Sequence, residues 1–299
     1  MNLKKTATIV GGTTGVSYLT YQAISDHMFK RAFKQSKHEI KVDSQYQEWL
    51  DRSKTEKVNI TSFDGLKLTA LDIHNHDSDR YVILLHGIWA DKRINYPRAY
   101  EFDQLGYNTL IIDQRAAGES EGKYYTYGFK ESMDLMQWID LLIKKYPKVQ
   151  ICLYGISMGA ATVMMATRYK MPGNVKCIVE DCGFSSVEEQ FDTVLRKDYN
   201  IIFTKVILKM LEDRMADQFG MHYEDLSVKD ILDHNEIPIM FIHGKEDDFV
   251  PFEMSLRLYN HNKGPKKYYP VEGARHTEAV SDENYYRHID DFIRQYFKQ

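Results

Sequence analysis

Apolar residues along the chain gather into short runs that alternate with longer stretches of mixed polar and apolar character. Eight runs have the length, composition and flanking turns of β-strands. They cover residues 58–63, 66–74, 81–87, 108–113, 149–155, 176–182, 237–244 and 266–273. Residues 96–106 and 128–146 show the spacing of amphipathic helices. This alternation predicts an α/β fold in which helices cover both faces of a mostly parallel sheet that begins with a hairpin.

One interval interrupts the alternation of strands and helices. More than fifty residues separate Cys182 from Pro238, whereas a crossover between parallel strands needs about a dozen. Two stretches within it, 186–199 and 201–219, read as amphipathic helices. We predict that residues 184–236 form a helical cap over the carboxyl edge of the sheet, where ligands of such sheets bind.

The first fifty residues differ from the rest, which we assign to one domain spanning residues 51–299. Lys4 and Lys5 precede an uncharged stretch, residues 6–24, about as long as a membrane span. This pattern is typical of an uncleaved anchor in the cell membrane, but the stretch is rich in Thr and Gly, so a polar leader on a cytoplasmic protein is the alternative. Residues 25–49 are charged and helical in pattern, and would link the anchor to the domain.

Charge and cysteine content exclude several classes of function. The net charge is -4 and acidic and basic residues are interspersed, so no basic stripe favours nucleic acid as a partner. The three cysteines, Cys152, Cys177 and Cys182, lie on or beside apolar runs and are odd in number. They are typical of small core residues rather than of disulfides or metal ligands. No metal and no cofactor is predicted.

Residues 149–159, "VQICLYGISMG", carry the first candidate chemistry. An apolar strand ends here in Gly-x-Ser-x-Gly, and a helical pattern follows. Ser157 therefore lies on a sharp strand-to-helix turn, and the crowding of strand and helix requires residues without a Cβ at Gly155 and Gly159. Such a turn raises the hydroxyl above the sheet as a candidate nucleophile.

A serine nucleophile needs a base, and the base needs a group that orients it. Asp247 follows the strand run 237–244, and His276 follows the final run, so both lie in loops at the same edge as Ser157. The chain order Ser, Asp, His is the order expected on this kind of sheet. Asp248, next to Asp247, and Asp181, at another strand end, are alternative acids. We interpret His86 and His243, which precede glycines at strand ends, as structural histidines.

Acyl transfer also needs hydrogen-bond donors for the oxyanion of the tetrahedral intermediate. The backbone N–H of Met158 follows the nucleophile at the start of a helix, where the helix dipole favours negative charge. The loop after residues 81–87 offers a second donor, the backbone N–H of Ile88.

Five stretches occur together over residue 58 to the end: "LLHGIWADK", "IIDQRAAGESEGKYYTYG", "LYGISMGAA", "IHGKEDDFVP" and "GARH". In this order they resemble the α/β-hydrolase fold, and more narrowly bacterial serine hydrolases with an N-terminal anchor-like segment and a helical cap. The resemblance implies a nucleophile at Ser157, an acid at Asp247, a base at His276 and oxyanion donors at Ile88 and Met158. One position departs from it, since Ala117 stands where relatives often have histidine.

These patterns lead to a functional hypothesis with alternatives. The expected activity is that of a carboxylesterase, a hydrolase of small to medium apolar acyl esters that works through an acyl-enzyme. Thioesterase, lipase, peptidase and acyltransferase activities use the same machinery, and a membrane-tethered binding module without turnover is the non-enzymatic alternative. Seven apolar residues of the cap are interpreted as helix packing, with some of them at the cleft: Phe191, Leu195, Ile201, Ile202, Phe203, Ile207 and Leu211.

Overall fold

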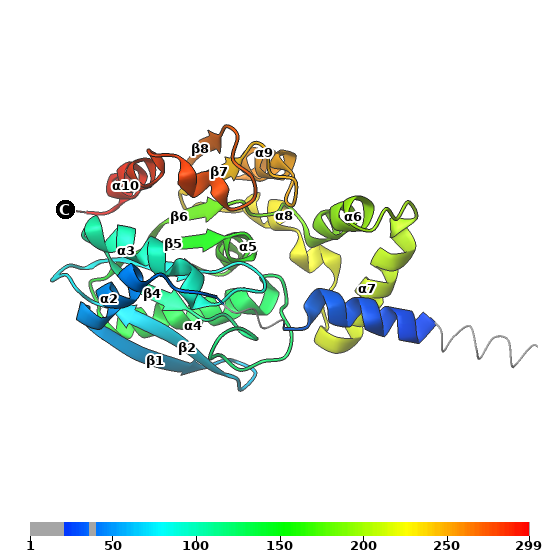
Figure 1. Ribbon diagram of the computed structural model, residues 1–299, viewed down its shortest axis with the longest axis horizontal. Coiled ribbons are helices and arrows are strands. Elements are labelled where there is room, and N and C mark those ends of the chain that lie inside the picture. Colours follow the sequence, from blue (N-terminus) through cyan, green and yellow to red (C-terminus); the bar gives the residue numbers. More distant parts are fainter. Residues whose placement is uncertain (1–20, 36–39, 299) are drawn as a thin grey trace, which may run out of the picture.

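The computed structural model describes residues 21–35 and 40–298, and an eight-stranded sheet runs through its centre (Figure 1). All eight predicted runs form strands, with small shifts at their ends. The strands are β1 (Thr55–Thr61), β2 (Lys67–Ile73), β3 (Arg80–Leu85), β4 (Asn108–Ile112), β5 (Gln150–Ile156), β6 (Val175–Asp181), β7 (Ile239–Gly244) and β8 (Lys266–Val271).

The order of the strands brings the candidate loops to one edge. It is β1-β2-β4-β3-β5-β6-β7-β8. The pairs β1/β2 and β2/β4 are antiparallel, and every other neighbouring pair is parallel. The prediction of a mostly parallel sheet with an N-terminal hairpin is therefore confirmed. Because parallel strands end at the same edge, the loops after β3, β5, β7 and β8 are neighbours.

Helices cover both faces of the sheet, as the alternation predicted. The α-helices after residue 40 are α2 (Ser44–Arg52), α3 (Tyr96–Gln104), α4 (Phe129–Lys145), α5 (Met158–Met165), α6 (Val187–Lys197), α7 (Thr204–Phe219), α8 (Val228–Leu232), α9 (Phe252–His261) and α10 (Tyr285–Tyr296). Short 3-10 helices occupy Lys92–Asn95, Ala166–Arg168, Tyr223–Leu226 and Glu278–Ser281.

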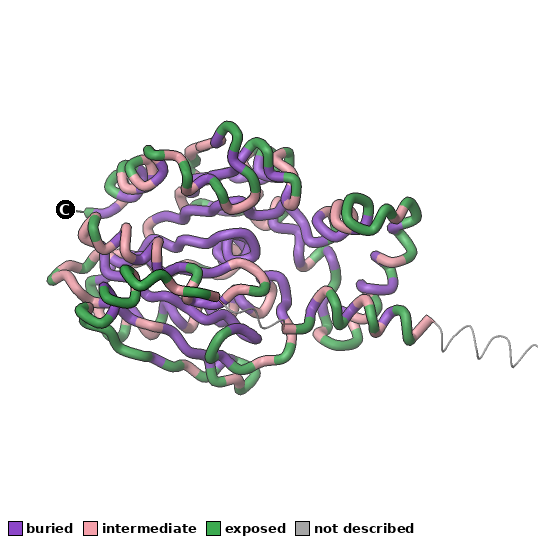
Figure 2. Tube along the Cα trace, in the orientation of Figure 1, coloured by how far each residue is buried: buried purple, intermediate pink, exposed green. Residues whose placement is uncertain are grey.

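Two buried apolar clusters hold these layers together. On one face α4, α5, α8 and α9 pack on the sheet through side chains such as Trp138, Met164 and Leu258. On the other face α2, α3 and α10 pack through side chains such as Phe102 and Phe292. In Figure 2 the buried strands run through the middle and exposed segments lie outside them. The three cysteines are free and buried, which confirms their interpretation as core residues.

The interval 184–236 contains α6, α7, Tyr223–Leu226 and α8. Helices α6 and α7 pack on each other, whereas α8 packs on α5 and α9 of the body. Figure 1 shows α6 and α7 standing beyond the end of the sheet. We call α6, α7 and the residues between them, 187–219, the cap.

Residues 21–33 form a helix that lies against the cap (Figure 1). The Phe29 ring stacks on Phe33 at 4.8 Å between centroids and lies 5.5 Å from Phe219 of α7. The Ser25 hydroxyl donates to the Met210 carbonyl at 3.3 Å, and Arg214 pairs with Asp26. The sequence predicts that residues 25–49 link the anchor to the domain, and the first part of this segment packs on aromatic side chains of the cap.

The candidate anchor, residues 6–24, falls largely outside the described residues. Its last four residues form the beginning of helix 21–33. Among the helices in residues 21–35 and 40–298, none combines the length and hydropathy that crossing a bilayer requires. The anchor therefore stays a prediction.

The turn between β5 and α5 is a tight junction at the sheet edge. Ser157 lies at its tip with φ 55° and ψ -118°, a conformation that L-residues rarely adopt. A Cβ added to Gly155 would come 2.2 Å from the Gly159 carbonyl oxygen, and one added to Gly159 would come 2.5 Å from that of Leu85 at the end of β3. Only glycine, whose side chain is a single hydrogen atom, fits at both positions.

This crowding predicts the effect of adding one methyl group. The variant Gly159→Ala should lose about 3 kcal/mol of folding free energy, because α5 must move away from β3 to admit the methyl group. Chemical denaturation measures the loss. Gly173→Ala is the matched control, since a Cβ there meets nothing within 4 Å. Equal stability of the two variants would refute the close packing at this turn.

Candidate active site

Three side chains from three loops form a continuous hydrogen-bonded chain. His276, beyond β8, places its Nε2 3.0 Å from the Ser157 Oγ. Its Nδ1 lies 2.7 Å from the Asp247 Oδ2, beyond β7. Since a carboxylate only accepts hydrogen bonds, the Nδ1–H donates to Asp247 and Nε2 is left to accept from the Ser157 hydroxyl. The three residues selected from the sequence thus have the geometry of a nucleophile, a base and its orienting acid.

Asp247 is held from several sides. Its Oδ1 accepts hydrogen bonds from the backbone N–H groups of Phe249 at 3.0 Å and Val250 at 2.8 Å. Its Oδ2 lies 3.2 Å from the Nε2 of His243 in addition to its bond with His276. Burial by itself would raise the pKa of the Asp247 carboxyl, but the hydrogen bonds from His243 and His276 outweigh it and hold that pKa well below its usual range. Asp247 is therefore a fixed anion.

The two alternative acids do not bond to the imidazole of His276. Asp248 is exposed and pairs with Arg275 at 3.2 Å. Asp181 is buried, accepts from the Tyr285 hydroxyl at 2.6 Å, and burial raises the pKa of its carboxyl. Of the three candidates, Asp247 alone has the geometry of an orienting acid.

His243 contributes more than the sequence suggested. We interpreted it as a structural histidine, and its Nε2 does lie 2.9 Å from the Val250 carbonyl oxygen. The same nitrogen also faces Asp247, so His243 supports the acid as well as the loop. A signal for this second role was present in the sequence, since the two residues are four positions apart and separated by a turn at Gly244.

Ile88 and Met158, which carry the candidate oxyanion donors, both line the cavity beside Ser157. The turn that carries Ile88 is fixed from behind by His86. Its Nδ1 donates to the Gly87 carbonyl at 2.7 Å, while its Nε2 accepts from the Gln114 N–H at 3.1 Å. Burial lowers the pKa of His86, which agrees with a neutral, structural imidazole.

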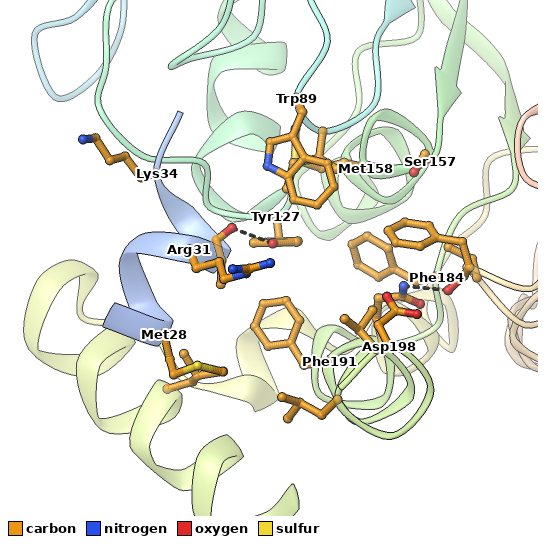
Figure 3. Close-up of a pocket in the computed structure, with 18 of the residues that line it drawn as sticks. Met28, Arg31, Lys34, Trp89, Tyr127, Ser157, Met158, Phe184, Phe191 and Asp198 are labelled. Atoms are coloured by element: carbon orange, nitrogen blue, oxygen red, sulfur yellow. Dashed lines mark hydrogen bonds between the residues drawn. The ribbon is translucent and has the colours of Figure 1, made fainter. Parts of the chain in front are cut away.

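A cavity of about 610 Å³ opens beside Ser157 (Figure 3). Its walls are mainly apolar and aromatic, and they come from distant parts of the chain. Contributors include Met28, Trp89, Tyr127, Phe184, Phe191 and Phe249. The helix 21–33 closes one side, where the Tyr127 hydroxyl donates to the Ala32 carbonyl at 2.7 Å. Such a cavity can hold the apolar part of a small molecule next to the hydroxyl.

The apolar cap residues divide into three groups. Phe191, Leu195 and Leu211 line the cavity. Ile201 and Ile207 pack against the apolar core. Ile202 and Phe203 have 76% and 81% of their surface exposed and lie away from the cavity lining. As expected for some of these residues, the first group both packs between helices and lines the cavity.

The contributions of Trp89, Tyr127 and helix 21–33 to this cavity do not follow from the sequence pattern. Trp89 and Tyr127 have positive φ angles of 60° and 52°, which turn their side chains out of loops that have no periodic pattern. Helix 21–33 comes from a segment far from Ser157 in sequence. Only its aromatic spacing, Phe29 and Phe33, indicated a buried face.

Two side-chain groups within the described residues have the spacing of metal ligands. Cys182 joins Asp247 and His276 in one group, but these two already bond to each other. Asp230, Asp233 and His261 form the other, where His261 bonds to Asp233 at 3.1 Å. Neither group has a further feature that indicates a metal.

Comparison with known proteins defines the class. A family model described as "alpha/beta hydrolase fold" matches residues 81–228. The chain is 29% identical over 237 residues to the uncharacterized protein YqkD of Bacillus subtilis, in an alignment covering 78% of this chain and 77% of YqkD. It is 23% identical over 252 residues to the uncharacterized protein YfhR of Escherichia coli K12, covering 80% of each.

A solved structure agrees with this class. The esterase Pf2001 of Pyrococcus furiosus superposes with a TM-score of 0.70 at 23% identity, covering 89% of this chain and 99% of the esterase. Together with the eight-stranded sheet and the strand-to-helix turn at Ser157, these similarities show that the chain has the α/β-hydrolase fold.

The environment of Asp247 predicts a pH-dependent contribution to stability. Asp247→Asn should cost about 2 kcal/mol at pH 7, because His243 and His276 then face an amide instead of a carboxylate. A carboxyl with a depressed folded pKa stabilises the fold fully above its unfolded pKa, near 4, and loses this contribution as pH falls toward the folded value. The difference from wild type should therefore be constant from about pH 8 to 5 and shrink below pH 4.

Urea denaturation across this pH range measures the difference. Asp248→Asn is the matched control, since this exposed neighbour should change stability by less than about 0.5 kcal/mol. A cost for Asp247→Asn that stays the same below pH 4 would contradict a depressed pKa.

Proposed function

We propose that the chain is a serine hydrolase that cleaves carboxylic esters of small to medium apolar acyl groups. The observation that carries the proposal is the chain of hydrogen bonds from Asp247 through His276 to Ser157, at one end of an apolar cavity. The likeness in fold to an esterase from Pyrococcus furiosus agrees with it.

In the proposed mechanism the Ser157 Oγ attacks the ester carbonyl carbon while His276 Nε2 takes the hydroxyl proton. The tetrahedral oxyanion accepts hydrogen bonds from the N–H groups of Ile88 and Met158. His276 then gives the proton to the leaving alcohol, and the carbonyl reforms as an acyl-enzyme. Water activated by His276 hydrolyses this ester, releasing the acid and restoring the Ser157 hydroxyl. Asp247 holds the imidazole and stabilises its protonated form.

This mechanism uses only groups of the chain itself. A serine at the tip of the turn, rather than an aspartate, argues against the dehalogenase and epoxide hydrolase chemistry that the same fold supports with an aspartate nucleophile. Cleavage of thioesters, lipid esters and peptides differs from the proposed mechanism only in the leaving group. Acyl transfer differs from it only in the acceptor of the acyl group. A binding module without turnover is the alternative from another class.

The first test removes the nucleophile. Ser157→Ala should abolish labelling by a fluorophosphonate and lower hydrolysis of p-nitrophenyl butyrate by at least about a thousandfold, since the acyl-enzyme no longer forms. Mass spectrometry of the labelled peptide locates the adduct. Asp247→Asn should also lower kcat strongly, while its neighbour variant Asp248→Asn should retain activity within about twofold.

The wild-type protein could also fail to hydrolyse p-nitrophenyl esters and carry no adduct on Ser157. The binding module would then be the better hypothesis. Equal losses for Asp247→Asn and Asp248→Asn would show that the orienting acid has been assigned wrongly.

The second test concerns the size of the acyl group. Val194 of α6 lines the cavity and is only half-buried. In Val194→Trp the larger ring should fill part of the apolar space, so the chain-length optimum on p-nitrophenyl esters should move to shorter acyl groups with little change on the acetate. Phe203→Ala is the control, because this exposed cap residue lies away from the cavity. An unchanged chain-length profile for Val194→Trp would mean that the acyl group binds elsewhere.

A further inference from the structure

The cavity beside Ser157 carries an excess of positive charge on the wall formed by helix 21–33. Three basic residues of that segment are among the lining residues, Lys30, Arg31 and Lys34, against one acidic residue from the cap side, Asp198. The chain as a whole has the opposite balance, with 39 basic and 43 acidic residues. The positive wall therefore does not follow from overall composition.

Arg31 is the basic residue that Figure 3 shows directed into the cavity. In Figure 3 its guanidinium points toward the space between Tyr127 and Phe191, whereas the Lys34 side chain points away. Lys30 lies 3.8 Å from Asp26 on its own helix. Within the described residues Arg31 makes no ion pair, and its only charge-related contact is the ring of Tyr199, 5.2 Å from its Cζ to the centroid. No acceptor in residues 21–35 and 40–298 takes a hydrogen bond from its five N–H donors.

Ser157 and Arg31 lie at opposite sides of this cavity in Figure 3, with Tyr127 between them. A molecule whose ester carbonyl reaches the Ser157 hydroxyl would pass its apolar part along the aromatic walls, and its far end would come to Arg31. A neutral apolar end would leave the guanidinium, which is exposed to solvent, without a charged partner. An anionic end would pair with it in a charge-assisted bond.

We propose that Arg31 determines substrate specificity by binding an anionic group at the far end of the substrate. The substrate class is then an ester with an apolar chain that ends in a carboxylate or a phosphate. This inference rests on the proposed function, because it takes Ser157 as the point where the ester is cleaved. A planar guanidinium binds both anions in a bidentate manner, so Arg31 would recognise either.

The test uses matched p-nitrophenyl esters of dicarboxylic acids from adipate to sebacate. Each is prepared with a free carboxylate, as its neutral methyl ester, and with a phosphonate in place of the carboxylate. In wild type, kcat/KM for the anionic ester should exceed that for the neutral one by about tenfold at the chain length that reaches Arg31, mainly through KM. This preference should fall as salt is added, because Arg31 is partly exposed.

Arg31→Gln should remove the preference at every length and leave the neutral esters little changed. Lys34→Gln is the matched control, since it removes one charge from the same helix at a side chain that points away from the cavity, and the preference should stay within about twofold. The carboxylate and phosphonate series tell the two anions apart by which one shows the larger ratio.

Two outcomes would overturn the proposal. Neutral esters preferred at all chain lengths would exclude an anion site. Equal losses on anionic and neutral esters in Arg31→Gln would mean that Arg31 only links helix 21–33 to Tyr199.

A failure of the proposed function is seen separately, as a lack of both turnover and fluorophosphonate adduct on Ser157. The anion site is then tested by calorimetric titration of the full chain with monomethyl suberate and with dimethyl suberate. Tighter binding of the monoanion that is lost in Arg31→Gln supports the site, and equal binding of the two compounds refutes it.

Discussion

The close approach of α5 to the ends of β3 and β5 is the contact on which the rest of the site depends. Two glycines, Gly155 and Gly159, permit it, since a Cβ at either position would collide with backbone. The same contact forces Ser157 into a positive φ angle and leaves the Met158 N–H at the open end of a helix. The candidate nucleophile and one candidate oxyanion donor are thus fixed by one packing constraint, and the strain at Ser157 is balanced by the burial of α5.

Around this turn, the neighbouring loops are held by polar contacts rather than by apolar packing. His86 ties the loop after β3 to Gln114, and Asp247 ties the loop after β7 to its own backbone and to His243. Both histidines are buried, so each hydrogen bond counts for more than it would in water. The imidazole of His276 therefore meets an acid and a hydroxyl whose positions are already set.

The sequence predicted the sheet, and that Ser157, Asp247 and His276 lie together, because both follow short-range rules. Buried parallel strands read as apolar runs, and a loop after such a strand must lie at the carboxyl edge, which places Ser157, Asp247 and His276 together. The positions of the residues that line the cavity do not follow from such short-range patterns. Trp89 and Tyr127 depend on single backbone angles in loops, and Phe203 lies outside the cavity although its apolar character matches that of Phe191. Their places follow from tertiary packing, which a local pattern does not encode.

The parts of the structure that the sequence predicted belong to the shared fold, and the parts that it did not predict are particular to this chain. The family model matches residues 81–228, which contain Ser157, both candidate oxyanion donors and the cap. Helix 21–33 lies outside that match, yet it supplies Arg31 and one wall of the cavity. Because function on a shared fold depends on the segments added around it, the proposed chemistry lies at the sheet edge, and the proposed substrate choice involves the cap and the helix 21–33 that precedes the sheet. A chain shortened past residue 21 would therefore alter the cavity as well as the candidate anchor.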